Sequence, residues 1–204
     1  MKLEAVKLGK RFNRDWIFRD LSFTFVPGNI YAIVGPNGSG KSTLLKILWG
    51  QLPPSSGEVW LRGETSTIPA SESYPHVSIA TPYMELIDEF TLLEMVSFHF
   101  KFKKPVAGLA ADQIISALEL EGARDKRVGE FSSGMKQRLK LGLAFFSDTA
   151  MLFLDEPSTN LDNESNRWYH TNLGKTGGRI VVIASNQADE YPPDAVKLDV
   201  TLFK

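Results

Sequence analysis

The segment Gly35–Thr43, GPNGSGKST, joins a short apolar stretch, NIYAIVG, to a helical pattern that runs from Lys41 to Trp49. It fits the pattern G-x-x-x-x-G-K-[ST], in which a strand ends in a glycine-rich loop and a helix follows. Glycines let successive backbone N–H groups curve around a phosphate without a Cβ atom in the way. The helix N-terminus adds unpaired N–H groups and the positive end of its dipole. The segment therefore predicts a phosphate-binding loop in an α/β fold.

Each position of this loop is a candidate nucleotide contact. Lys41 can reach the outer phosphates as a point charge, and the Ser42 hydroxyl is placed for Mg²⁺. The alternative is a glycine-rich turn that only caps a structural helix, but average composition produces this pattern by chance in under roughly one chain in 100 of this length. The predicted nucleotide contacts are Gly35, Pro36, Asn37, Gly38, Ser39, Gly40, Lys41, Ser42 and Thr43.

A second candidate site is the acidic pair in AMLFLDEP. Four apolar residues, Met151–Leu154, precede Asp155 and Glu156, which would emerge at the carboxyl end of a buried strand. Open α/β sheets bind their ligands there. Asp155 is predicted to hold Mg²⁺ through its water shell, and Glu156 to orient the attacking water. Acids also end strands as ordinary turn or cap residues, and the upstream phosphate loop favours the catalytic interpretation.

The length, net charge and cysteine content limit the classes of partner and of chemistry that we expect. The 204 residues fit one domain, or one domain with a smaller lobe. Lys plus Arg (23) nearly balances Asp plus Glu (24), so the charge of −1 gives no reason to expect a nucleic acid or a polybasic membrane patch. The lack of cysteine excludes disulfides and thiol catalysis. We also expect neither a signal peptide nor a membrane-spanning segment.

Strands that alternate with helices from residue 29 onward predict a mostly parallel sheet. Two helices are expected in an insert, one from Glu85 to about Lys103 and one from Ala110 to Leu120. The polar segment 64–75, ETSTIPASESYP, is expected to be a loop.

The segment FSSGMKQRLKLGLA, just before the acidic strand, resembles the signature sequence of ATP-binding cassette (ABC) ATPases. STNLD, Ser158–Asp162, is similar to the D-loop of that family, and the order of motifs agrees over nearly all of the chain. The resemblance implies a P-loop NTPase core with helices on both faces of a mostly parallel sheet, an N-terminal antiparallel β subdomain and a small α-helical subdomain. It implies one nucleotide-binding domain over 1–204, with the core at 1–83 and 131–204 and the helical subdomain at 84–130.

The resemblance also implies partners. In the family the signature binds the γ-phosphate of ATP held by a second cassette, so a head-to-tail dimer, here a homodimer, is expected, with ATP and Mg²⁺ as cofactors. The membrane subunit would be a separate permease, which would hold the chain at the inner face of the cell membrane. The alternative interpretation of this segment is an ordinary serine N-cap at the start of a helix. The signature positions are Ser132, Ser133, Gly134 and Met135.

Three further positions are matched through the family. Phe12 falls where an aromatic ring stacks on adenine, with Trp16 as a nearby competitor. Asn186, in IVVIASNQ, replaces the family's switch histidine, and an uncharged amide predicts slow hydrolysis. A plain polar strand end is the alternative for Asn186, and Gln187 could compensate for the missing histidine. Tyr83 replaces the glutamine that touches Mg²⁺.

The sequence thus favours an ATP-hydrolysing subunit of an ABC transporter, more specifically an exporter. An ATP-gated dimerising module with little hydrolysis, acting on a non-transport partner, is the alternative. A P-loop kinase of small molecules is a third, which would leave the signature and the D-loop unexplained.

Overall fold

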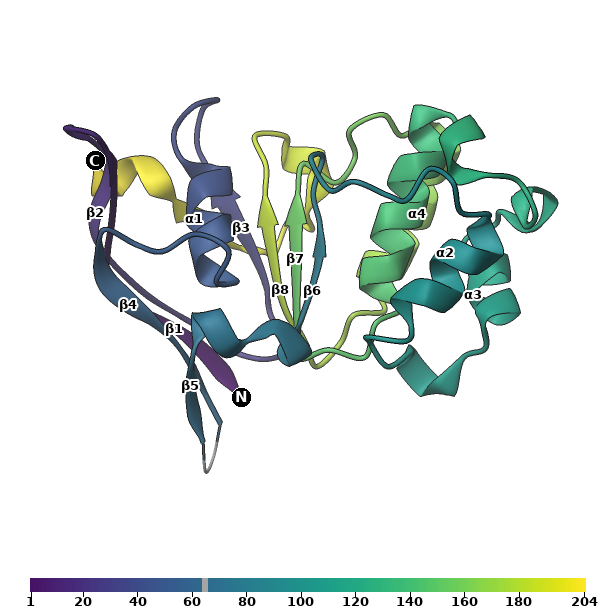
Figure 1. Ribbon diagram of the computed structural model, residues 1–204. Coiled ribbons are helices and arrows are strands. Elements are labelled where there is room, and N and C mark those ends of the chain that lie inside the picture. The colour runs from purple at the N-terminus through teal and green to yellow at the C-terminus, as the bar shows by residue number, and fades with distance from the viewer. Residues whose placement is uncertain (64–65) are drawn as a thin grey trace. The chain divides into compact units, whose positions relative to one another are not determined.

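The computed structural model describes residues 1–63 and 66–204, and the chain divides into two compact units. The first unit comprises 1–77, 150–156 and 177–204, and the second comprises 78–149 and 157–176. Figure 1 shows the elements of both. The second unit is larger than the expected helical insert, 84–130, because it also contains the helices that follow the signature and the D-loop. The division of the chain at 84 and 130 stays a prediction.

An antiparallel sheet opens the first unit. Its strands follow the order β2-β1-β4-β5, and β1 pairs with both β2 and β4. Leu3 and Leu8 of β1 are fully buried, whereas neighbouring Lys2 and Lys7 face solvent, as expected for a sheet with one covered face. The strand bounds are β1 (Lys2–Phe12), β2 (Asp15–Phe25), β4 (Ser56–Arg62) and β5 (Thr67–Pro69).

The other sheet of the first unit is parallel, with β3 paired to β8 and β9, and β8 paired to β7. Every residue of β7 and β8 is buried, which is typical of strands covered on both faces. Helix α1 (Lys41–Leu48) follows β3 and contacts β3, β7 and β8 (Figure 1). The strand bounds are β3 (Ile30–Val34), β7 (Met151–Asp155), β8 (Ile180–Ala184) and β9 (Val196–Asp199).

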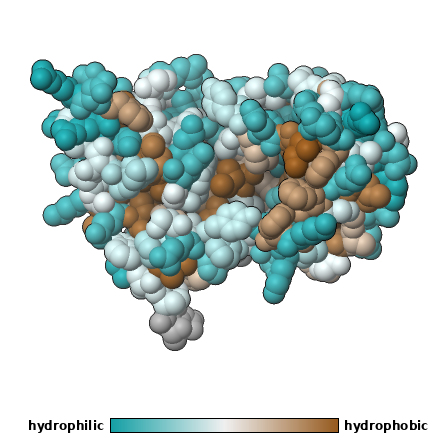
Figure 2. Space-filling view, in the orientation of Figure 1, coloured by the Kyte–Doolittle hydropathy of each residue, from teal (hydrophilic) through white to brown (hydrophobic). Residues whose placement is uncertain are grey.

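The second unit is built mainly of helices. Leu92, Ile114 and Leu139 are fully buried in its core, and Gly142 leaves room for the Leu118 side chain, which lies 1.9 Å from where a Cβ would stand. Figure 2 shows that apolar residues also reach the visible surface over these helices. The helix bounds are α2 (Leu92–His99), α3 (Ala111–Ala117), α4 (Ser133–Phe145) and α5 (Asn163–Leu173). Strand β6 (Val77–Ala80) begins at the last residue of the range 1–77 of the first unit and continues in the second.

The mixed α/β architecture, with one parallel and one antiparallel sheet, confirms the expected fold class. The predicted start of the first insert helix at Glu85 is wrong. Thr91 and Glu94 form a capping box, in which the Glu94 N–H donates to Thr91 Oγ1 and the Thr91 N–H donates to Glu94 Oε2, so α2 begins at Leu92. The expected loop 64–75 contains β5 and two short 3₁₀ turns, while its residues 64 and 65 lie outside the described part of the chain.

Candidate functional site

The phosphate-binding loop lies at the carboxyl end of β3. Gly40, with φ of 104°, caps the N-terminus of α1 without a side-chain hydrogen bond, so the first N–H groups of the helix face the loop. Two glycines explain the shape of the loop. A Cβ on Gly40 would stand 2.3 Å from Ile17 Cγ2, and one on Gly35, with φ of 144°, would stand 2.7 Å from Ser39 Oγ. A side chain would therefore clash with Ile17 of β2 at Gly40 and with Ser39 of the loop itself at Gly35.

The groups inside the loop suit an anion. Lys41 is 5% exposed, and its Nζ donates to the carbonyl oxygens of Gly35 at 3.0 Å and Pro36 at 3.2 Å. The buried Ser39 Oγ has no hydrogen-bond partner within residues 1–63 and 66–204. An ammonium and an orphaned hydroxyl beside open backbone N–H groups match a chain of phosphates in charge and in hydrogen-bonding capacity.

Ser42 and Asp155 join the loop to the acidic strand. Ser42 Oγ donates to Asp155 Oδ1 at 2.9 Å, although 113 positions separate the two residues in sequence. Asp155 is 2% exposed at the end of β7, and burial raises the pKa of its carboxyl, which the Ser42 hydrogen bond opposes and the nearby Glu156 charge reinforces. A hydroxyl and a carboxylate are the hard oxygen ligands that Mg²⁺ prefers, so this pair fits that ion.

Glu156 follows Asp155 in an unusual backbone conformation. Its φ is 44°, in the left-handed region that non-glycine residues seldom adopt, and its N–H donates to Ala184 O at 2.9 Å. The hydrogen bond ties the turn after β7 to the end of β8. The backbone conformation and this hydrogen bond fix Glu156 directly after the acidic strand, and its catalytic role stays a prediction.

The polar residues that follow β8, Ser185–Gln187, make two kinds of contact. Ser185 is fully buried, its N–H donates to Ile33 O at 3.2 Å, and its Oγ accepts from the Gln187 N–H at 2.8 Å. Asn186 is exposed, and its Nδ2 donates to Asn37 Oδ1 of the phosphate-binding loop at 2.9 Å. Ser185 therefore serves the turn, whereas Asn186 reaches the loop that would hold the phosphates.

The signature segment lies in the second unit, at the start of α4. Ser132 is the N-cap, and its Oγ accepts from the Met135 N–H at 3.2 Å. Ser132 and Ser133 are exposed, and Gly134 and Met135 are partly exposed. A serine-capped helix N-terminus with open side chains is suited to a further anion.

The family model described as ABC transporter matches residues 18–159. The chain belongs to the ABC transporter family. It is 32% identical over 186 residues to the Nod factor export ATP-binding protein I of Burkholderia lata, covering 89% of this chain and 61% of the relative. It is also 32% identical over 194 residues to the uncharacterized ABC transporter ATP-binding protein YybJ of Bacillus subtilis, covering 92% and 87%.

The fold agrees with this membership. The chain superposes with a TM-score of 0.82, at 21% identity, on the structure of a Pyrococcus furiosus protein described as an ABC transporter ATP-binding protein, covering 100% of this chain and 99% of that one. The chain thus has the fold of the ABC family's ATPases. It spans about three fifths of the length of the Nod factor export relatives.

The other residues matched through the ABC family are exposed. Phe12 ends β1, is 49% exposed, and has Lys10 Nζ at 5.1 Å from its ring centroid. Trp16 is 37% exposed, and the guanidinium carbons of Arg11 and Arg19 lie 5.6 and 5.7 Å from its ring centroid. Both rings remain candidates for stacking on adenine.

Tyr83 belongs to the second unit and is 81% exposed. It lines a cavity of about 700 Å³ together with Glu85, Asp88, Lys136 and Lys140. The structure thus brings Lys41, Ser42 and Asp155 together, and Asn37 with Asn186, within the first unit. The metal contact of Tyr83 and the nucleotide contacts of the signature stay predictions.

Two buried residues behind the signature received no role from the sequence. Gln137 is 5% exposed and Arg138 is 8% exposed, and both bond to the segment after the acidic pair. The available signal in the sequence was their position directly behind the signature in FSSGMKQRLKLGLA, whereas their burial is seen only in the structure. Among the helices of residues 1–63 and 66–204, none is long and apolar enough to cross a membrane.

Proposed function

We propose that this chain is the ATP-hydrolysing subunit of an ABC exporter and energises a separate permease that spans the membrane. The observation that carries the proposal is the 2.9 Å hydrogen bond between Ser42 Oγ and Asp155 Oδ1, which joins the phosphate-binding helix to the acidic strand. The relatives named as Nod factor export proteins support the direction of transport.

The residues of the first unit supply the proposed chemistry. The Lys41 ammonium would exchange the loop carbonyls, at 3.0 and 3.2 Å, for the outer phosphate oxygens. Ser42 and Asp155 would hold Mg²⁺, which when bound neutralises charge that develops on the phosphates. The Glu156 carboxylate would accept a hydrogen bond from the attacking water and orient it. Asn186 would donate its amide N–H to the γ-phosphate.

The proposed assembly is a homodimer in which two chains sandwich two ATP molecules head to tail. Ser132, Ser133, Gly134 and Met135 would then contact the ATP held by the partner chain. ATP-driven closure would shift the permease between conformations, and hydrolysis would reset it. The subunit would lie at the cytoplasmic face of the membrane, held there by the permease, and no nucleic acid is expected as a partner because the net charge is −1.

A second candidate is an ATP-gated dimerising module that hydrolyses rarely and acts on a non-transport partner. The neutral Asn186 favours it, since this residue already donates to Asn37 and cannot carry the charge of a histidine. Its expected signature is tight ATP binding with turnover far below that of a transport ATPase.

The testing experiment compares ATP binding and Mg-ATP turnover of the chain with those of Lys41→Ala. We expect the variant to lose both, because Lys41 is the ammonium buried in the loop. The matched control is Lys175→Ala, an exposed lysine after α5, which should keep both. Undiminished ATP affinity in Lys41→Ala would refute the phosphate-binding loop. Co-purification with a polytopic membrane protein would separate the exporter from the second candidate.

A further inference from the structure

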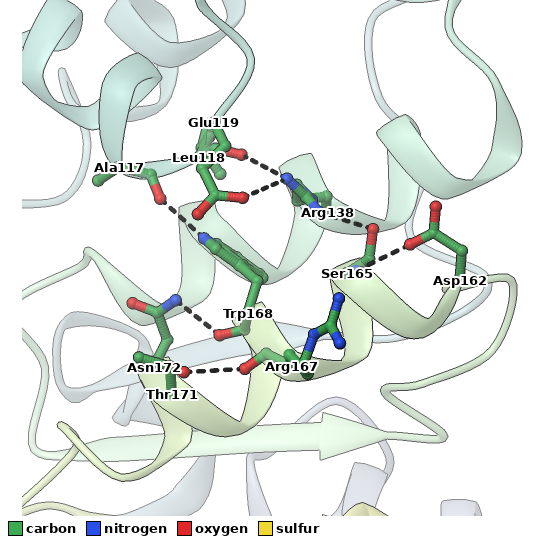
Figure 3. A network of polar contacts seen from close by, with 10 residues as sticks. All are labelled: Ala117, Leu118, Glu119, Arg138, Asp162, Ser165, Arg167, Trp168, Thr171 and Asn172. Atoms are coloured by element: carbon green, nitrogen blue, oxygen red, sulfur yellow. Dashed lines mark hydrogen bonds and ion pairs between the residues drawn. The ribbon is translucent and has the colours of Figure 1, made fainter.

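Arg138, a buried residue of α4, lies at the centre of a partly buried polar network (Figure 3). One guanidinium nitrogen donates to Glu119 Oε2 at 2.9 Å, and the other donates to Ser165 Oγ at 2.8 Å. The guanidinium carbon also lies 5.5 Å from the centroid of the Trp168 ring. The planar fork of an arginine can hold these directions at once, whereas a lysine would supply one point charge.

The network continues to the end of the D-loop segment, Ser158–Asp162. The Ser165 N–H donates to Asp162 Oδ1 at 2.8 Å, and Asp162 is the N-cap of α5. Ser165 therefore accepts a hydrogen bond from Arg138 and donates one to Asp162. Arg138 thus fixes the first turn of α5, on which the D-loop ends.

Two other residues of α4 contact Pro157, which precedes this segment, and Asn160 within it. Gln137 Nε2 donates to Pro157 O at 2.8 Å, in a buried position. A Cβ on Gly134 would stand 3.1 Å from Asn160 O, so the helix approaches the middle of the segment closely. The first turns of α4 therefore contact the beginning, the middle and the end of residues 157–165.

We propose that Arg138 is a positioning residue that holds the D-loop segment Ser158–Asp162 to the signature end of α4, so that the two move as one body. The inference rests on the proposed function, in which this end of α4 contacts the partner chain's ATP. Arg138 touches neither nucleotide nor water in that scheme, and it acts through Ser165 and Asp162.

The experiment measures kcat and KM for Mg-ATP, with hydrogen exchange of the amides of residues 158–162, in Arg138→Met. The control is Arg167→Met on α5, because Arg167 is exposed and enters the network only through its backbone oxygen. A displacement of a reacting group by about 1 Å can lower a rate about 100-fold. We expect kcat of Arg138→Met to fall about 10- to 100-fold with KM within twofold of the parent chain, and exchange at 158–162 to accelerate. The control should change neither.

The outcomes separate this inference from the proposed function. Unchanged kcat and unchanged exchange in Arg138→Met would overturn the inference while ATP hydrolysis stands. If the parent chain does not hydrolyse ATP, the proposed function fails and the exchange result alone decides: faster exchange supports the positioning role, and equal exchange overturns it. Should Arg138→Met not fold, Ser165→Ala, which removes one acceptor of the fork, is subjected to the same two measurements.

Discussion

At the residue scale, Asn186, which the family resemblance matches to a switch histidine, reaches the phosphate-binding loop. Its amide Nδ2 donates to Asn37 Oδ1 at 2.9 Å, so a side chain of this length spans the space between β8 and the loop. A protonated imidazole would make a charge-assisted hydrogen bond, roughly twice as strong as a neutral one. We expect Asn186→His to raise kcat for Mg-ATP about tenfold, which corresponds to ~1.4 kcal/mol.

The control for that variant is Gln187→His, which places the same ring on the next exposed residue. It should leave kcat at the parent value, because Gln187 is held in the turn by the hydrogen bond from its N–H to Ser185 Oγ. Equal rates for the parent chain and Asn186→His would make the residues after β8 a polar strand end and assign the γ-phosphate contact to another residue.

The buried carboxylate of Asp155, which would bind Mg²⁺, is expected to lower the stability of the metal-free chain at neutral pH. Burial raises the pKa of its carboxyl, so the folded chain holds this proton more tightly than the unfolded chain. Stability from this group is therefore present at low pH and is lost as the pH rises through the raised pKa. In the absence of metal and nucleotide, Asp155→Asn should raise Tm at neutral pH by ~2–4 °C and reduce its decline with pH. Mg²⁺-dependent turnover should be lost.

Thermal unfolding from pH 4 to 8 measures this effect, and Asp194→Asn, at an exposed aspartate of the same unit, is the control. A lower Tm for Asp155→Asn than for both the control and the parent chain would show that the Ser42 hydrogen bond outweighs the burial of the charge.

At the element scale, the turn between β3 and α1 depends on glycine for two separable reasons. Gly40 and Gly28 both have positive φ, 104° and 81°, but a Cβ meets Ile17 at 2.3 Å in the first and no atom within 4 Å in the second. Gly28→Ala should lose only ~1–2 kcal/mol through backbone strain. Gly40→Ala should lower the free energy of unfolding by more than this, as measured by urea unfolding. It should also abolish ATP binding, as measured by nucleotide titration. Equal losses of unfolding free energy in the two variants would mean that the loop accommodates the Cβ added at position 40.

The elements that sequence reasoning predicted and those it missed differ in a physical way. β7, β8 and α1 were predictable because burial and the loop chemistry act on residues that are adjacent in sequence. β9 was missed because Val196 and Lys197 are exposed at the edge of the sheet, next to β3, so no apolar alternation marks it. The start of α2 was misplaced because the apolar residues before it continue the helical rhythm, whereas the Thr91 cap decides the boundary.

At the scale of the whole molecule, the candidate site was predictable as a set of residue types but not as a set of contacts. The spacing of the loop and the acidic pair identified Lys41 and Asp155, yet the hydrogen bond between Ser42 and Asp155 exists only because β3 and β7 both pair with β8. The contacts of Arg138 were unpredictable for the same reason, although the residue itself stands in the signature segment, since its partners Glu119 and Ser165 are distant in sequence.

The last prediction concerns the ATP-dependent dimer of the chain. If Glu156 orients the attacking water, Glu156→Gln keeps the size of the side chain and its position after β7 but removes the charge that polarises the water. Lys41, Ser42 and Asp155 are untouched, so ATP still binds, and a dimer held together by ATP has no hydrolytic route to separation. We expect sedimentation of Glu156→Gln at saturating Mg-ATP to show mainly dimer, whereas Glu164→Gln, an exposed glutamate in the first turn of α5, should turn ATP over as the parent chain does. A Glu156→Gln chain that binds ATP yet sediments only as a monomer would argue against the head-to-tail sandwich, and with it against any role of Ser132 and Ser133 at the partner's phosphates.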